Sequence, residues 1–155
     1  MFRNRHVLRK KDARKIFDEL EKQLDCKIDG EAEIAEFKDM KILFIDKKLT
    51  VFFIDDKPFL NLLGLRTYSP KKRFLTVDDG AIKHIVGGAD VMAPGVIEMD
   101  EGIKRGDIVW VRDGRGNPIS VGKALMDAEE IKKEKKGKVV ENIHHLGDEI
   151  WKLST

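Results

Sequence analysis

The chain has 155 residues, of which 37% are charged and 41% hydrophobic, and 30 Lys and Arg face 28 Asp and Glu, so the formal net charge is +2. A chain of this length forms one or two small domains, and its apolar content excludes global disorder. The near balance of charge excludes a basic tail or a uniformly electropositive nucleic-acid binder.

Other features narrow the class of protein. No apolar run approaches the ~18 residues of a membrane span, and the charged start of the chain does not resemble a signal peptide. Cys26 is the only cysteine, which excludes an internal disulfide or a cysteine-rich zinc site. We therefore expect a soluble, cytoplasmic protein without membrane contacts.

The two halves of the chain differ in charge. Residues 1–74 hold 18 basic and 13 acidic residues, a balance of +5, and residues 75–155 hold 12 and 15, a balance of −3, which together give +2. The basic excess lies at the start and near Pro70. The cations there that are candidates for phosphate contacts are Arg3, Arg5, Arg9, Lys10, Lys11, Arg66, Lys71, Lys72 and Arg73. We place a domain boundary here, between residues 1–73 and 74–155.

The first half predicts a helix and a small antiparallel sheet. Apolar residues from Ala13 to Leu24 recur at helical spacing, with Asp12 as the expected N-cap. Lys41–Ile45 and Leu49–Ile54 predict a hairpin, and Glu33–Phe37 is a candidate third strand. Pro58 is expected in the first turn of a helix that carries Phe59, Leu62, Leu63 and Leu65.

The second half predicts a small barrel or sandwich, because its segments are short and eight of the thirteen glycines fall between residues 80 and 116. Two short helices are expected, one capped by Asp78 or Asp79 and ended by Gly87-Gly88, the other capped by Asp127. The expected extended segments are Phe74–Val77, Val91–Ala93, Val96–Met99, Ile108–Arg112, Ile119–Ala124, Val139–Asn142 and Ile150–Leu153.

Residues suited to catalysis are scarce. Cys26 ends a helix beside Asp25, where both the helix end and the carboxylate disfavour a thiolate, so we interpret it as structural. Asp55-Asp56 and Asp78-Asp79 are more typical of a turn and a helix cap than of an acid–base pair. His144 and His145 point to opposite faces if they lie in a strand, which favours one packed and one exposed ring over a metal site. We expect no catalytic residue, no metal and no cofactor.

The most informative segment is Val77–Gly95, where a short helix with an exposed Lys83 precedes a double glycine, a small residue and a Pro-Gly corner. Small residues allow another backbone to approach closely. Such a surface suits a single-stranded RNA end, whose bases are splayed and read at short range. A helix cap followed by a barrel corner would account for the glycines equally well. The Lys132–Lys138 run is usually a solvated loop, with phosphate contact as the alternative.

This segment resembles the signature of the PUA domain, named for pseudouridine synthases and archaeosine transglycosylases. The tail Gly137–Trp151 is similar to that of the malignant T-cell amplified sequence and ligatin family of translation factors, as are Pro58-Phe59 and Tyr68-Ser-Pro70. The similarity covers nearly the whole chain, and the compact length of the chain is typical of an archaeal relative.

The resemblance implies an α+β fold, in which a pre-PUA helix and antiparallel sheet precede a PUA pseudo-barrel with short helices. It implies a non-catalytic RNA-binding protein of translation, whose partners include tRNA or ribosomal RNA, the small ribosomal subunit and a protein like the density-regulated protein. The expected RNA groove consists of Lys83, Gly88, Ala89, Asp90, Val91, Met92, Pro94 and Gly95. The same resemblance implies a structural role for His144 and His145 and a core position for Trp151.

We expect the groove to hold the CCA end of a tRNA and the basic first domain to dock on ribosomal RNA or a protein. Two alternatives stay open. The chain is an accessory subunit of a tRNA-modifying enzyme of the archaeosine transglycosylase type, or it is a protein-interaction adaptor that has lost RNA binding.

Overall fold

The computed structural model describes residues 1–155, which divide into two compact units: Met1–Lys71 with Leu153–Thr155, and Lys72–Lys152. Each unit combines helices with a single sheet, so the predicted α+β class is confirmed. None of the helices has the length and apolar character needed to cross a membrane.

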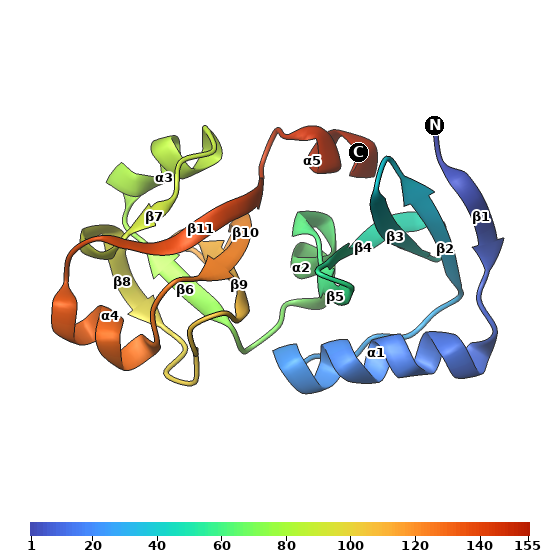
Figure 1. Ribbon diagram of the computed structural model, residues 1–155, viewed down its shortest axis with the longest axis horizontal. Helices are drawn as coiled ribbons and strands as arrows, with labels where there is room; N and C mark the ends of the chain where they lie inside the picture. Colours follow the sequence, from blue (N-terminus) through green and yellow to red (C-terminus); the bar gives the residue numbers. More distant parts are fainter. The chain divides into compact units, whose positions relative to one another are not determined.

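The first unit is a five-stranded antiparallel sheet in the order β1-β2-β3-β4-β5, with α1 packed beside it (Figure 1). Its elements are β1 (Arg3–Val7), α1 (Lys10–Leu24), β2 (Ala32–Phe37), β3 (Met40–Ile45), β4 (Lys48–Ile54), β5 (Lys57–Leu60) and α2 (Leu62–Tyr68).

The core of this unit forms where the apolar face of α1 meets the sheet. Phe17, Leu20 and Leu24 are buried on α1, and Phe52 and Phe59 are buried on β4 and β5. Each such side chain contributes roughly 1.5–3 kcal/mol when it is fully removed from water. The predicted helix, the β3–β4 hairpin and the third strand are therefore confirmed.

Two details of the first unit were predicted wrongly. Asp12 is not the N-cap of α1: Arg9 occupies that position, and Asp12 lies in the first turn, where it pairs with Arg9 at 3.0 Å. Pro58 does not begin a helix but lies in β5, the edge strand, where a residue without an N–H is tolerated. The helix begins later because Asn61 caps it, accepting a 2.8 Å hydrogen bond from the Gly64 amide.

The basic start of the chain forms β1, a strand that the sequence analysis did not predict. It lies at the other edge of the sheet, and all five of its residues are exposed. Because a strand this exposed lacks the alternation of buried and exposed residues, its sequence carries no period-two signal.

The second unit is a six-stranded mixed sheet in the order β7-β11-β10-β9-β6-β8, with only the β6–β9 pair parallel. Its elements are β6 (Phe74–Val77), α3 (Asp79–Val86), β7 (Val91–Met92), the 3-10 turn η1 (Ala93–Gly95), β8 (Val96–Met99), β9 (Ile108–Arg112), β10 (Pro118–Ala124), α4 (Ala128–Glu134), β11 (Lys138–His145) and α5 (Glu149–Ser154), the last reaching into the residues grouped with the first unit.

The sheet curls around one apolar cluster, which includes Leu75, Ile85, Val91, Val109 and Val140. In Figure 1 the long strand β11 passes between β7 and β10, as the hydrogen-bonded order requires. The predicted caps are confirmed, because Asp78 caps α3 and Asp127 forms a capping box with Glu130 at the start of α4.

The end of the chain differs from the expectation. Ile150–Leu153 is not extended but belongs to helix α5, which begins where Asp148 accepts a 2.9 Å hydrogen bond from the Trp151 amide. Trp151 is consequently only partly buried and is not a core residue. A six-residue helix is too short to display helical periodicity in its sequence.

Candidate nucleic-acid interface

The candidate site begins at α3, whose two ends are fixed by local hydrogen bonds. The Asp78 carboxylate accepts from the Ala81 amide at 2.9 Å, and the Ala89 amide donates to the His84 carbonyl at 3.0 Å. Gly88, rather than Gly87, adopts a positive φ of 100°. A side chain at position 88 would be strained there and would lie 3.4 Å from the ring of His145.

A groove of about 690 Å³ lies between α3, the loop that follows it and η1. Its lining is mainly apolar or small, with charged groups at Asp78, Asp90 and Lys138; the remaining lining residues are Ala81, His84, Ile85, Gly88, Ala89, Met92, Pro94 and Gly95. The groove therefore offers an open apolar floor beside exposed main chain.

Six of the eight residues predicted for the groove line it: Gly88, Ala89, Asp90, Met92, Pro94 and Gly95. The other two do not. Lys83 is exposed on α3 but is not part of the lining, and Val91 is buried in the core with 1% of its surface exposed.

The residues that sequence reasoning missed have two origins. Ala81, His84, Ile85 and Gly88 follow the i, i+3, i+4, i+7 spacing of one helical face, a signal that would have selected His84 in place of Lys83. Lys138 comes from β11, where it pairs in register with Met92 of β7. The pairing of β7 with β11 joins segments far apart in the sequence, so no local pattern predicts it.

Asn142 fixes the loop that follows α3 through hydrogen bonds. Its side-chain amide donates to the carbonyls of Ile85 at 3.0 Å and Ala89 at 2.9 Å, and its backbone amide donates to Asp90 Oδ1 at 2.9 Å. These three bonds connect the loop to β11, so the groove wall is preorganised.

The charges of the groove are unusual for a phosphate site. Lys138 is its only lining cation, and its Nζ lies 3.4 Å from Asp90 Oδ2. Asp78 adds a second carboxylate. The groove therefore carries no unpaired positive charge to attract a phosphate.

Several of the predicted phosphate contacts are occupied by internal ion pairs. Arg3 lies 3.6 Å from Glu36, and Arg9 pairs with Asp12 as described above. Arg73, in the second unit, is partly buried and lies 3.7 Å from Asp107.

Arg5 is the most firmly held of these cations. It lies 3.2 Å from the carboxylate of Glu33 and 3.8 Å from the centre of the Phe44 ring. Hydrogen bonding from Arg5 is the largest influence on Glu33 and lowers the pKa of its carboxyl, and Lys47 acts in the same direction. The other predicted contacts, Lys10, Lys11, Arg66, Lys71 and Lys72, are exposed.

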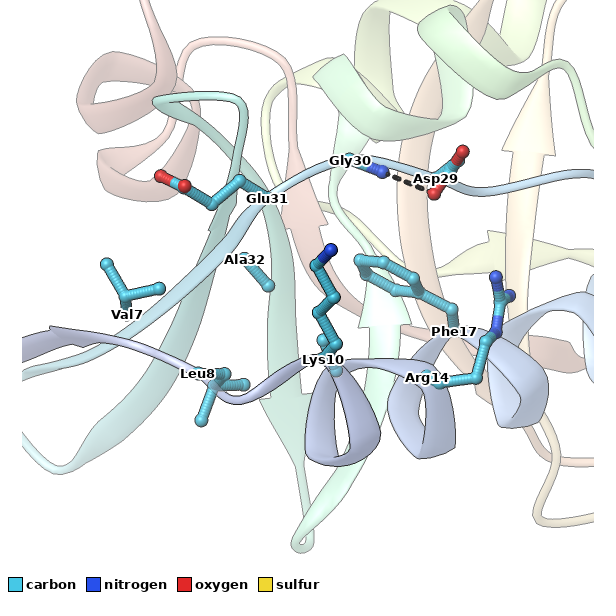
Figure 2. A pocket seen from close by; sticks show the side chains of 10 residues that line it. Val7, Leu8, Lys10, Arg14, Phe17, Asp29, Gly30, Glu31 and Ala32 are labelled. Carbon is cyan, nitrogen blue, oxygen red and sulfur yellow. Dashed lines mark hydrogen bonds between the residues drawn. The ribbon is translucent and has the colours of Figure 1, made fainter.

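A second hollow lies in the first unit, between the start of α1 and the β1–β2 region. Figure 2 shows its wall of Val7, Leu8, Ala32 and Phe17, with the Lys10 side chain rising between Ala32 and Phe17. Val7 is 55% exposed there. The hollow thus combines an apolar wall with charged residues of both signs, namely Lys10, Arg14, Asp29 and Glu31.

The two histidines and the cysteine occupy structural positions. His144 is fully buried, as predicted for one of the two rings, whereas His145 is partly buried and not exposed as expected. The described residues contain no group of three or more His, Cys, Asp or Glu side chains placed to hold a metal ion. Burial, with smaller effects from Glu21 and Asp25, raises the pKa of the Cys26 thiol to about 11, which disfavours the thiolate.

Comparison with known proteins finds a different family match in each of the two units. Residues 73–146 match the PUA domain family, and residues 4–66 match a domain of unknown function, DUF1947. An uncharacterised protein of Methanocaldococcus jannaschii is 44% identical, with 96% of each chain covered. Translation machinery-associated protein 20 of Schizosaccharomyces pombe is 30% identical, covering 88% of this chain and 80% of that protein.

The chain belongs to the translation machinery-associated protein 20 family. This family includes the malignant T-cell-amplified sequence proteins, and protein 1-A of Xenopus laevis is 31% identical over 75% of this chain and 67% of its own length. The resemblance identified in Val77–Gly95 and Gly137–Trp151 is thereby confirmed.

Solved structures confirm the fold. A conserved PUA domain protein from Thermoplasma acidophilum is 33% identical and superposes with a TM-score of 0.88 over 98% of this chain and all of that one. A hypothetical protein from Pyrococcus horikoshii is 34% identical, with a TM-score of 0.83 over 97% and 99% of the two chains. The predicted PUA pseudo-barrel is therefore the fold of the second unit.

Proposed function

We propose that this member of the family is a non-catalytic RNA-binding protein of translation, and that its groove holds a single-stranded RNA end. The observation that carries the proposal is the position of the groove within the PUA-matched residues. Its small residues and exposed loop leave room for a ribose and its base to approach closely, and its apolar floor suits unstacked bases. Relatives named for the translation machinery support the biological setting.

The RNA end that we propose is the CCA terminus of a tRNA, which is single-stranded and accessible. The first domain, residues 1–73, would dock on the small ribosomal subunit or on a protein partner like the density-regulated protein, and residues 74–155 would read the RNA. We assign these two roles from the net charges of the two halves, because the first 74 residues carry a balance of +5 and the rest carry −3. Long-range attraction then comes from the first domain and close-range reading from the groove.

The decisive experiment compares the binding of intact tRNA and tRNA lacking its CCA end across a salt series, with small ribosomal subunits measured in parallel. Met92→Glu places an anion on the groove floor at a side chain that is 46% exposed, so the core is not disturbed. The matched control is Ile97→Glu, because Ile97 is 61% exposed on β8 and does not line the groove.

We expect trimming the CCA end and Met92→Glu each to weaken binding about tenfold, and Ile97→Glu to leave it unchanged. If intact and trimmed tRNA bind with equal affinity and Met92→Glu has no effect, the groove is not the binding site of the CCA end. Binding to ribosomal subunits alone would then point to the first domain.

A further inference from the structure

A further hollow, of about 640 Å³, lies in the second unit between the edge strand β8 and helix α4, and we call it the β8–α4 hollow (Figure 1). Most of its wall is apolar and consists of Ala93, Pro94, Val96, Ile97, Met99 and Ile131. Only Pro94 also lines the groove, so the two are separate surfaces. Connected apolar surface with a polar rim is typical of a site that binds a partner.

Ile97 is the exposed aliphatic side chain of this wall, with 61% of its surface open to solvent. The residues on either side of it pair with Thr76 and Val77, which are neighbours in β6, so Ile97 itself forms a bulge in β8. A bulge re-aims the side chain that it carries and is common next to functional sites. Because the chain leaves most of Ile97 uncovered, burying it against a partner would favour binding.

The charge that is left unpaired at the hollow is positive. Both acidic residues of its lining form ion pairs, Glu101 with Lys132 and Glu98 with Arg112 at 3.9 Å. Lys135, the C-cap of α4, also lines the hollow, but it is exposed and forms no ion pair. An occupant with carboxylates beside an apolar stripe would therefore match both the wall and its charged edge.

The lining favours a protein segment over RNA. None of its residues is aromatic or Arg, so a base would have no ring or guanidinium on which to stack. The bulge at Ile97 also interrupts the regular edge that the addition of a strand to β8 would need. An amphipathic helix needs only an apolar hollow that accepts side chains one turn apart.

We propose that the β8–α4 hollow docks an acidic amphipathic helix of another protein. The apolar side chains of that helix would pack on Ile97, Met99 and Ile131, and a carboxylate on its flank would meet Lys135. The proposal does not rest on the RNA groove, because the linings of the two surfaces differ in every residue except Pro94. The chain would thus hold RNA and a protein partner at the same time.

The test selects ligands from a display library of short helix-forming peptides. Each peptide carries leucines at positions i, i+3, i+4 and i+7, and the positions beside this stripe are varied between Glu and Lys. We expect the wild-type chain to enrich peptides with Glu. In fluorescence anisotropy, an enriched peptide should bind about tenfold more tightly than the same peptide with Lys at each Glu position, because like charges repel across an interface.

Variants of the chain then locate the binding surface. Ile97→Ser removes apolar surface without adding charge and should weaken binding of the enriched peptide about tenfold, as at an interface hot spot. Met92→Ser is the matched control at a side chain that is 46% exposed and outside the hollow, and it should have no effect. Lys135→Glu should bring the affinities for the Glu and Lys peptides to within about twofold of each other, whereas Lys41→Glu, at an exposed position on β3, should preserve the difference.

Several outcomes would overturn the proposal. They are failure to enrich any peptide, equal binding by the wild-type chain and Ile97→Ser, and a preference for Lys peptides. A loss of tRNA affinity in Ile97→Ser as large as that in Met92→Glu would make the hollow part of the RNA path instead. Self-association of the wild-type chain that Ile97→Ser abolishes, measured by sedimentation velocity, would make the occupant a second copy. If tRNA still binds both Ile97→Ser and Lys135→Glu while no peptide is enriched, the docking helix alone is rejected and the proposed function stands.

Discussion

The buried ring of His144 is hydrogen-bonded to the carboxylate of Asp148, with 2.9 Å between Nδ1 and Oδ2. Because a carboxylate only accepts, Nδ1 carries the proton. Asp148 also accepts from the backbone amides of His145 and Trp151, each at 2.9 Å, so it connects the end of β11 to the start of α5. Burial alone would raise the pKa of Asp148, but the hydrogen bonds and charge interaction with His144, together with the amides, lower it below its usual value.

The Asp148 carboxylate should therefore stabilise the fold at neutral pH. Since its folded pKa lies below the ordinary value of 3.8, its contribution is present above that value and is lost as the pH falls through the folded pKa. Asp148→Asn should lower the free energy of unfolding by about 2 kcal/mol at pH 7, because charged acceptors are replaced by a weaker one that also brings unpaired donors.

Urea unfolding at pH 7 and at several values below pH ~4 would measure this effect. The difference between the wild-type chain and Asp148→Asn should shrink as the solution becomes more acidic. Glu19→Gln, on the exposed face of α1, is a suitable control and should change stability little. A pH-independent difference would contradict the role of the charge.

The β4–β5 hairpin offers a stabilising substitution. Its turn residues Asp55 and Asp56 have positive φ values of 50° and 64°, a conformation that favours glycine at the second position. Asp56→Gly should raise the free energy of unfolding by about 0.5–1 kcal/mol, because it relieves the crowding between Cβ and the backbone.

Thermal or urea unfolding would detect this change, and Asp56→Ala is the informative control because alanine keeps the Cβ. We expect no stabilisation from alanine. A gain of similar size in both variants would show that removal of a negative charge, rather than backbone relief, is responsible.

Local sequence signals predicted those elements whose stability depends on neighbours in the chain. The spacing of Ala13, Phe17, Leu20 and Leu24 was sufficient for α1, and the Asp78 cap was sufficient for the start of α3. β1 escaped prediction because its pairing partner β2 lies about 30 residues away and its own residues are all exposed. Pro58 was misinterpreted because tolerance at a sheet edge depends on topology.

The candidate site, like the fold, could be predicted only where its residues lie close together in the sequence. The loop from Gly88 to Gly95 could be recognised from its small residues, and the structure brings it to the groove. Lys138 and Asn142 belong to the site only because β11 pairs with β7 and its Asn142 hydrogen-bonds to the loop, and neither fact is local. Lys83 was chosen for its charge, but the side chains that face the groove follow the helical spacing to His84.

Lys138 lines the groove and Lys83 does not, so the two lysines can be compared directly. Lys138→Glu would place a third carboxylate in the groove beside Asp90, so we expect tRNA affinity to fall about tenfold, an effect of the size of one charge-assisted hydrogen bond. Lys83→Glu has the same change in charge on an exposed face outside the lining and should cost no more than about twofold. Filter binding or anisotropy at ~50 mM salt would measure both, and a larger effect at Lys83 would move the RNA path onto the outer face of α3.

The salt dependence of RNA binding should come from the first domain rather than from the groove. Arg3, Arg5 and Arg9 are exposed and form ion pairs within the chain, and Lys10 and Lys11 are exposed cations at the start of α1. Each phosphate contact contributes ~0.7–0.9 to the slope of log affinity against log salt, so the double variant Lys10→Ser/Lys11→Ser should reduce that slope by about 1.5. Lys41→Ser/Lys48→Ser removes the same charge from exposed positions on β3 and β4 and should leave the slope nearly unchanged. Equal reductions in the two variants would mean that RNA responds to the net charge of the domain, and the start of α1 would then have no specific part in docking.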